Sequence, residues 1–178
     1  DRDRWQWKMD GSKDIHAGLQ ALQPWSFEQW AAIEKHGIPV LMARGSTVRE
    51  EWERQIKDIT KRPNQCMLSS RLNPDGGAAP DGAANGLDVY WTCPGLAVNS
   101  PLHQSEIGNV LAEKSGTYGL VWSLTPGELV VRCSIRSIGD YDVSSIAKFY
   151  GGGGHRNAAG FNVPLSAIGD IIRPASST

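Results

Sequence analysis

The sequence predicts an α/β fold, with a mixed β-sheet of about five strands flanked by helices and preceded by a helical connector. Two observations predict it. Apolar residues recur at helical spacing through the first sixty or so residues, and after Pro63 alternating, strand-like runs are interleaved with helical ones. We therefore place a domain boundary at this change, between residues 1–62 and residues 63–178.

Three helices are predicted before the sheet. Ser12 is expected to cap the first, and Ser26 with Gln29 has the spacing of a capping box for the second, which Gly37 closes. The third covers residues 47–61 and carries Glu–Arg and Glu–Lys pairs at i,i+4 spacing. A long and mostly polar helix of this kind suits a connector that lies along a surface.

The second part of the chain alternates strands with helices. The predicted strands cover residues 66–72, 87–92, 96–98, 118–124, 129–137 and 160–164. The predicted helices cover residues 105–114 and 143–150, the latter capped by Asp142, and a short helix follows the last strand. Residues 73–86 are rich in Gly, Ala, Pro, Asp and Asn, and are predicted to be a loop without an assigned function.

Composition limits the classes of function. The formal net charge is −1, so any contact with nucleic-acid phosphates must come from a local patch rather than from the whole surface. Three cysteines without Cys-x-x-Cys spacing indicate a reducing, cytoplasmic location, and no apolar run approaches the roughly 18 residues of a membrane span. Because the chain begins at Asp1 rather than at Met, we expect a fragment whose amino-terminal part is missing.

A glycine-rich run is the strongest functional signal. Four consecutive glycines lead into three potential side-chain donors: Gly151, Gly152, Gly153, Gly154, His155, Arg156 and Asn157. Glycines let the backbone adopt positive φ and approach a ligand, and successive amides in such a turn can bind an anion. A flexible linker is disfavoured because the run lies between a capped helix and an apolar strand. The run therefore predicts a pocket for the phosphate of a nucleotide-like ligand.

The strand over residues 129–137 supplies a second signal. Alternation places Arg132, Ser134 and Arg136 on one face, opposite its apolar residues. Arginine binds phosphate through two parallel hydrogen bonds, and this strand is expected to lie beside the glycine run. We favour a binding role for Arg136, whereas for Arg132 a solvated strand face and a binding role are both left open.

These residues resemble a known family. The run from Gly151 to Gly160 resembles the Gly-Gly-Gly-His-x-x-Ala-Ala-Gly signature of the type-one DHH-associated domain, the carboxy-terminal, substrate-binding half of many DHH-family phosphoesterases. The segment Ser134-Ile135-Arg136-Ser137 resembles the family strand before it, and residues 142–147 resemble the helix that leads into the glycines. Residues 1–5 resemble the end of the DHH catalytic domain, so residues 1–62 would hold that end and the helical connector.

The resemblance implies a manganese-dependent phosphoesterase of the oligoribonuclease or phosphodiesterase type. Arg136, Ser137 and residues 151–157 would bind the substrate, a nucleotide or short oligonucleotide, and two manganese ions would sit in the catalytic half. The Asp-His-His triplet of that half is absent from this sequence, and only Asp1, with Asp3 left open as the alternative, would correspond to the family's last metal-binding aspartate. We therefore assign no catalytic residue and predict that this chain alone does not hydrolyse substrate. Its expected partners are the substrate, its own missing DHH domain and, as an open alternative, a second copy.

Two alternatives compete with this interpretation. One is a non-catalytic nucleic-acid-binding appendage, similar to the related tRNA-binding domains of alanyl-tRNA synthetases. The other is a protein-interaction or dimerisation domain in which the glycine-rich turn is only structural. A phosphate site carries no base information, so short RNA, short DNA, cyclic dinucleotides and phosphorylated nucleotides all stay open as ligands.

Overall fold

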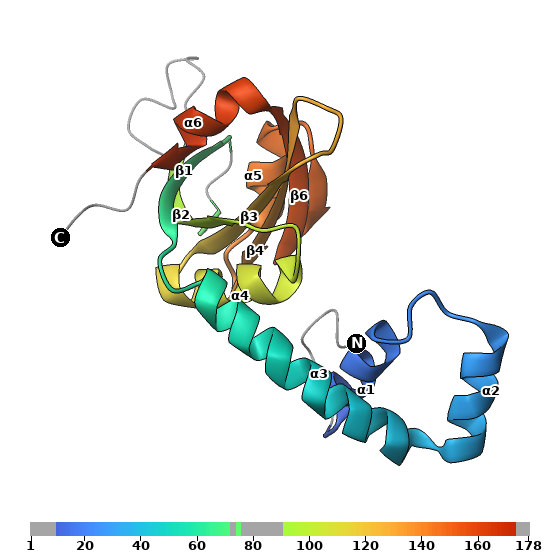
Figure 1. Cartoon of the computed structure of the whole chain (residues 1–178). Helices are drawn as coiled ribbons and strands as arrows, with labels where there is room; N and C mark the ends of the chain where they lie inside the picture. Colours follow the sequence, from blue (N-terminus) through green and yellow to red (C-terminus); the bar gives the residue numbers. More distant parts are fainter. Residues whose placement is uncertain (1–9, 72–73, 76–90, 174–178) are drawn as a thin grey trace, which may run out of the picture. The chain divides into compact units, whose positions relative to one another are not determined.

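The structure, a computed structural model, describes residues 10–71, 74–75 and 91–173 (Figure 1). The chain divides into two compact units, Asp1–Lys57 and Asp58–Thr178. This division lies a few residues before the boundary at 62/63, which stays a prediction. The prediction for Asp1 and most of the predicted loop over residues 73–86 lie outside the described residues.

The first unit is helical. Its helices are α1 (Ser12–Gln20), α2 (Phe27–His36) and α3 (Ile38–Ile59), whose last residues belong to the second unit. The capping box is confirmed, because Ser26 Oγ accepts from the Gln29 amide and the Gln29 side chain accepts from the Ser26 amide. The predicted Ser12 cap is wrong: Gly11 occupies the N-cap in a left-handed conformation without a side-chain bond. Helix α3 begins earlier than predicted, because Pro39 is tolerated in a first helical turn.

The second unit is built on one sheet. Within the described residues seven strands follow the order β5-β6-β4-β3-β2-β1-β7. They are β1 (Asn64–Ser70), β2 (Trp91–Asn99), β3 (Tyr118–Leu124), β4 (Val130–Ser137), β5 (Gly153–His155), β6 (Ala158–Pro164) and β7 (Ile172–Arg173). Strands β2 and β3 are parallel and the other neighbours are antiparallel, so the predicted mixed sheet is confirmed. The helical elements of this unit are α4 (Gln104–Ser115), α5 (Val143–Phe149), η3 (Leu165–Ala167) and α6 (Ile168–Ile171).

The ends of β1, β4 and β6 lie within two residues of the predicted ones, and residues 87–90 of the predicted strand over residues 87–92 lie outside the described residues. Three larger differences concern β2, β5 and β7. Strand β2 is continuous through Pro94, because β3 pairs with β2 only from Leu96 onward and the proline therefore needs no donor on that side. Strand β5 was not predicted: it is short and glycine-rich, and it forms by pairing with the edge of β6. Strand β7 was also missed, because two residues carry no periodic pattern.

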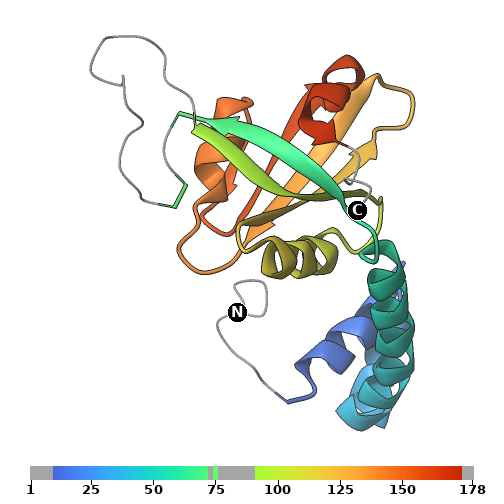
Figure 2. The same ribbon diagram turned by 90° about the vertical axis from the view of Figure 1, so that its left-hand side faces the viewer.

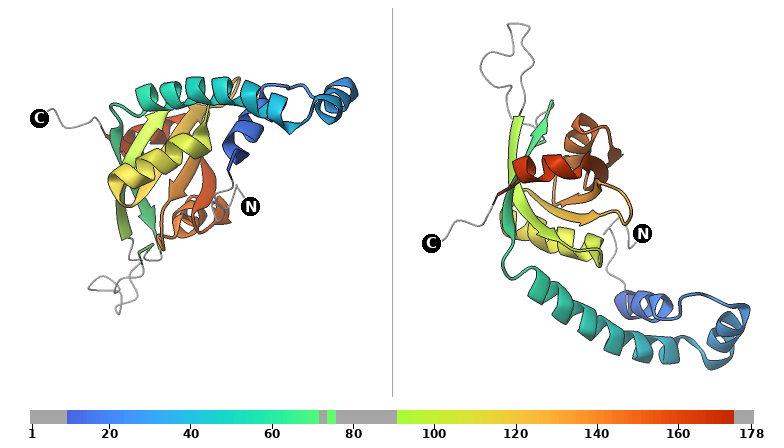
Figure 3. Two further views of the ribbon diagram at one scale, coloured as in Figure 1. Left: turned by 90° about the horizontal axis from the view of Figure 1, so that it is seen from below. Right: turned by 45° about the horizontal axis from the view of Figure 1, so that its top comes forward.

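The two faces of the sheet are covered by different helices (Figures 2 and 3). Helices α5 and α6 pack on the face that carries the main apolar core, which includes Leu120, Ile135, Ile146 and Phe161. Helix α4 packs on β2, β3 and β4 from the other side. Its approach is close, since a Cβ on Gly119 would lie 2.2 Å from the Gly108 carbonyl oxygen. The face that carries Arg136 is therefore the α4 face.

No helix in the described part of the chain has the length and apolar character needed to cross a membrane.

All three cysteines are free and buried in the sheet unit. The Cys66 thiol donates to the Tyr118 hydroxyl at 3.5 Å, and that hydroxyl donates to the Cys93 carbonyl at 2.7 Å. Burial raises the pKa of Cys66 and of Cys133 to about 12, and it also raises the pKa of Cys93.

We predict that the folded chain resists thiol-modifying reagents at about pH 8.5, where an ordinary cysteine is about half ionised. The raised pKa values keep the thiols protonated there, and burial excludes the reagent. Counting modified cysteines by mass spectrometry should give none in buffer and all three in denaturant. Rapid labelling of Cys66 in the folded protein would show that the core is not packed as described.

Candidate functional site

The glycine-rich run begins as the end of α5. The Gly151 amide donates to the Lys148 carbonyl at 3.1 Å and the Gly152 amide donates to the Ala147 carbonyl at 2.8 Å. Gly151 has φ +76°, and a Cβ on Gly152 would lie 2.1 Å from the Gly160 carbonyl oxygen. The fold itself thus requires these two glycines, and both of their amides are already used by the helix.

Gly153 is different, because the fold does not require a glycine there. Its backbone lacks the positive φ of Gly151 and Gly154, and a Cβ built on it would have no neighbour within 4 Å. It lies on β5 opposite Gly160 of β6. A side chain at Gly153 would stand on the same face as Ser134, because paired residues on neighbouring strands share a face. The glycine therefore keeps space open above the sheet.

The register of three strands arranges the predicted residues in rows across this face. His155 pairs with Ala158, which pairs with Arg136, and this row crosses β5, β6 and β4. Two strand spacings separate the outer members, which places their Cα atoms about 9.5 Å apart. The middle strand contributes only a methyl group between an imidazole and a guanidinium group.

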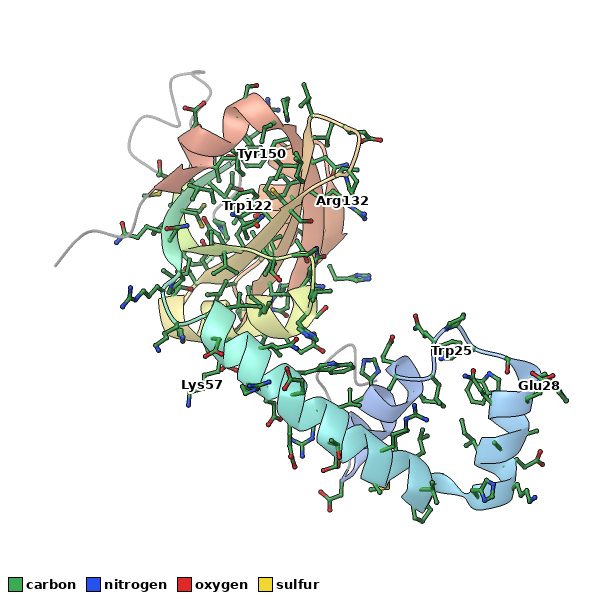
Figure 4. The ribbon with its side chains drawn as sticks, viewed as in Figure 1. Trp25, Glu28, Lys57, Trp122, Arg132 and Tyr150 are labelled. Carbon is green, nitrogen blue, oxygen red and sulfur yellow. The ribbon has the colours of Figure 1, made fainter. Side chains whose placement is uncertain are left out.

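A groove of about 530 Å³ lies over these strands, and polar groups make up most of its surface. Its lining includes Gln104 from the start of α4, Arg132, Ser134 and Arg136 from β4, Gly151–Gly154, and Gly160 and Asn162 from β6. His155 is exposed and directly follows the last glycine of the lining. Figure 4 shows Arg132 and Tyr150 in the sheet unit; Arg132 is exposed, whereas the Tyr150 ring stacks on Phe161 with centroids 4.7 Å apart.

Arg136 is held firmly within this groove. Its Nη2 donates to Ser105 Oγ in the first turn of α4 at 2.9 Å, and its Nη1 donates to Ser134 Oγ at 3.1 Å and to the Ile135 carbonyl at 3.0 Å. These bonds leave the Nε–H and one Nη2–H as donors for a ligand. Burial lowers the pKa of Arg136, and the negative charge of Glu106 opposes that shift. The groove therefore contains a fixed, partly desolvated positive charge.

Four of the predicted site residues do not line the groove: His155, and Arg156, Asn157 and Ser137, which make other contacts. Arg156 Nη1 forms an ion pair with Asp140 at 3.0 Å. Asn157 Nδ2 donates to Ser137 Oγ and to the Gly139 carbonyl, both at 3.0 Å, and Ser137 Oγ donates to the Tyr141 carbonyl at 2.6 Å. These contacts fix the loop between β4 and α5, and a role of these residues in substrate binding stays a prediction.

Gln104 and Asn162 are polar lining residues that the sequence did not indicate. Gln104 precedes the predicted helix and carries no local pattern, so only the packing of α4 on the sheet reveals it. Asn162 could have been found, because alternation along β6 places it on the same face as Gly160. The structure also brings Arg132 into the groove, where it is the Cα partner of Asn162.

The described residues do not fit a metal centre. Among residues 10–71, 74–75 and 91–173, no three His, Cys, Asp or Glu side chains gather where they could hold a metal ion. No reaction step through manganese is therefore assigned to these residues.

Comparison with known proteins identifies the domain that contains the groove. Residues 96–177 match the family model of the DHHA1 domain, which confirms the predicted resemblance over that range. The last residues of β2, the strands from β3 to β7, α4, the glycine-rich turn and both arginines all fall within these residues. Residues 96–177 are therefore similar to a DHHA1 domain, a domain associated with DHH phosphoesterases.

Two curated proteins are similar to this chain. Oligoribonuclease NrnB of Bacillus subtilis is 40% identical over 76 residues, which cover 42% of this chain and 18% of that protein. The uncharacterized protein R106 of Acanthamoeba polyphaga mimivirus is 29% identical over 164 residues, which cover 90% of this chain and 34% of that protein. The matches thus span about a third or less of either relative. An uncharacterized protein from Helicobacter pylori G27 matches the structure with a TM-score of 0.33 and 17% identity, over 72% of this chain and 30% of that one.

We predict that the same substitution destabilises the fold at one of two neighbouring glycines and has little effect at the other. Gly152→Ala should lower the free energy of unfolding by about 1–3 kcal/mol, because its Cβ would collide with the backbone of β6. Gly153→Ala should change it by less than about 0.5 kcal/mol, because its Cβ meets open space. Urea unfolding of both variants measures the difference, and equal losses would contradict the described turn.

Proposed function

We propose that the groove over β4, β5 and β6 binds the phosphate of a nucleotide or short oligonucleotide, as the substrate-binding part of a metal-dependent phosphoesterase. The observation that carries the proposal is the row in which Arg136 and His155 flank Ala158, beside Gly153, where a side chain would meet open space. The DHHA1 match and the similarity to an oligoribonuclease support the same class of ligand.

The chemistry of the row suits a phosphate. Arg136 offers its remaining N–H groups from a fixed position, so little conformational entropy is lost when they bind an anion. His155 approaches from the opposite side as an additional donor, and the glycine at 153 lets phosphate oxygens come close to the backbone. Charge is concentrated in this patch although the formal net charge of the chain is only −1.

Hydrolysis is proposed for the whole protein rather than for these residues. Two manganese ions in a DHH catalytic half outside this chain would supply an activated water and stabilise the developing charge. The groove would hold the substrate phosphate for that centre, in a cytoplasmic protein. We assign the described residues the tasks of binding and orienting the substrate.

The two alternatives predict different ligands. A tRNA-binding appendage would prefer folded RNA over short phosphorylated ligands. A protein-interaction domain would leave both classes of nucleic acid unbound.

We predict that His155→Ala weakens the binding of a 5′-phosphorylated dinucleotide about ten-fold, because one charge-assisted hydrogen bond is lost. The 178-residue chain and its variant are compared by isothermal titration calorimetry. Arg62→Ala serves as the control, because Arg62 is exposed ahead of β1, near the other edge of the sheet.

The same dinucleotide without its 5′-phosphate should bind more weakly and should be insensitive to the change at His155. Equal affinity of the two dinucleotides for the unmodified chain would contradict phosphate binding. Tight binding of folded tRNA alone would favour the appendage, and no binding of either kind would favour the protein-interaction domain.

A further inference from the structure

The groove has a second polar end that the phosphate row does not use. Arg132 on β4 and Asn162 on β6 are Cα partners, both are exposed, and both line the groove. Arg132 lies four residues from Arg136 along the same strand and on the same face, so their Cα atoms are about 13 Å apart. One face of the sheet therefore presents two cationic rows rather than one.

The path between the two rows is free of large side chains. The intervening row consists of Ser134, Gly160 and Gly153, which are Cα partners across β4, β6 and β5. All three line the groove. A ligand lying along the strands can therefore extend from the Arg136 row to the Arg132 row without displacing a side chain.

The two arginines differ in how many of their N–H donors are already hydrogen-bonded. Arg136 donates to Ser105, Ser134 and a backbone carbonyl. Arg132 makes no hydrogen bond or ion pair with the described part of the chain, so its guanidinium group keeps all five N–H donors. Its neighbour Asn162 adds an amide that can both donate and accept.

We infer that Arg132 and Asn162 form a second subsite that binds a nucleotide further along the strand, so that the groove selects single-stranded ligands longer than a mononucleotide. Arg132 contacts a second phosphate through its planar fork of donors, and Asn162 contacts the sugar or base beside it. The inference rests on the proposed function, which places the first phosphate at Arg136 and His155.

The separation of the rows determines the minimum ligand length. A stacked strand advances about 3.4 Å per nucleotide, several times less than the ~13 Å between the rows. A mononucleotide therefore occupies one row at most. Affinity should increase with each added nucleotide until the ligand spans both rows and should then level off.

The test measures affinity against ligand length for the full 178-residue chain at one fixed salt concentration. The ligands are thymidine 5′-phosphate and its 5′-phosphorylated di-, tri- and tetranucleotides. For the unmodified chain the tetranucleotide should bind at least about ten-fold more tightly than the mononucleotide, as expected for one added charge-assisted contact. Arg132→Ala should remove most of this gain and leave the affinity for the mononucleotide within about two-fold.

Two further variants distinguish specific binding by Arg132 and Asn162 from general attraction by positive charge. Arg62→Ala removes the same charge from another part of the sheet unit and should keep the full length dependence. Asn162→Ala changes no charge and should reduce the length dependence. Because Arg132 and Asn162 are both exposed, urea unfolding should show unchanged stability for these variants.

The outcomes distinguish the subsite from the function on which it rests. The inference of a second subsite is wrong if the mononucleotide binds but affinity does not rise with ligand length, or if Arg62→Ala has the same effect as Arg132→Ala. Either result leaves the proposed phosphate groove unaffected. If Arg132→Ala weakens the mononucleotide as strongly as the tetranucleotide, Arg132 belongs to the first row and the inference is likewise overturned. If none of the phosphorylated ligands binds, both the proposed function and the subsite fail.

Discussion

The position of β6 between β4 and β5 is the constraint on which the candidate site depends. Among the residues that the structure describes, β5 pairs with β6 alone, and the α5–β5 turn fits against β6 because Gly152 has no side chain to collide with Gly160. The same pairing brings His155 level with Arg136, across the short side chain of Ala158. Any side chain at Gly152 would move the turn and separate His155 from Arg136, the two side chains proposed to bind phosphate.

A second close approach fixes the other side of the groove. Helix α4 lies against β3 at Gly119, and a Cβ on Gly108 would lie 2.8 Å from Arg136 Cγ. The arginine stem therefore runs past the helix, and its guanidinium group meets Ser105 in the first helical turn. The charge is thus oriented by the packing of the fold before any ligand arrives, which reduces the entropy that binding would cost.

Much of this arrangement is predictable from local patterns. Alternation along the strand predicted that Arg132 and Arg136 share one face. The sequence also predicted that Asp142 caps the helix that precedes the glycines, and the structure places its carboxylate 2.9 Å from the Ser144 amide. Strand β5 was not predictable, because three residues that include two glycines have no strand propensity and pair only when β6 is present. For the same reason the sequence could not separate Gly153, which the fold leaves free, from Gly152, which the fold requires.

Nuclear magnetic resonance of the ¹⁵N-labelled chain, titrated with a 5′-phosphorylated dinucleotide, tests most directly whether this sheet face binds phosphate. The largest amide shifts are expected at Gly153, Gly154 and His155 and at Arg136 on the facing strand. The amides of β1 and β7, at the other edge of the sheet, should stay unchanged. Shifts confined to that other edge, or none at saturating ligand, would contradict a phosphate site on β4, β5 and β6.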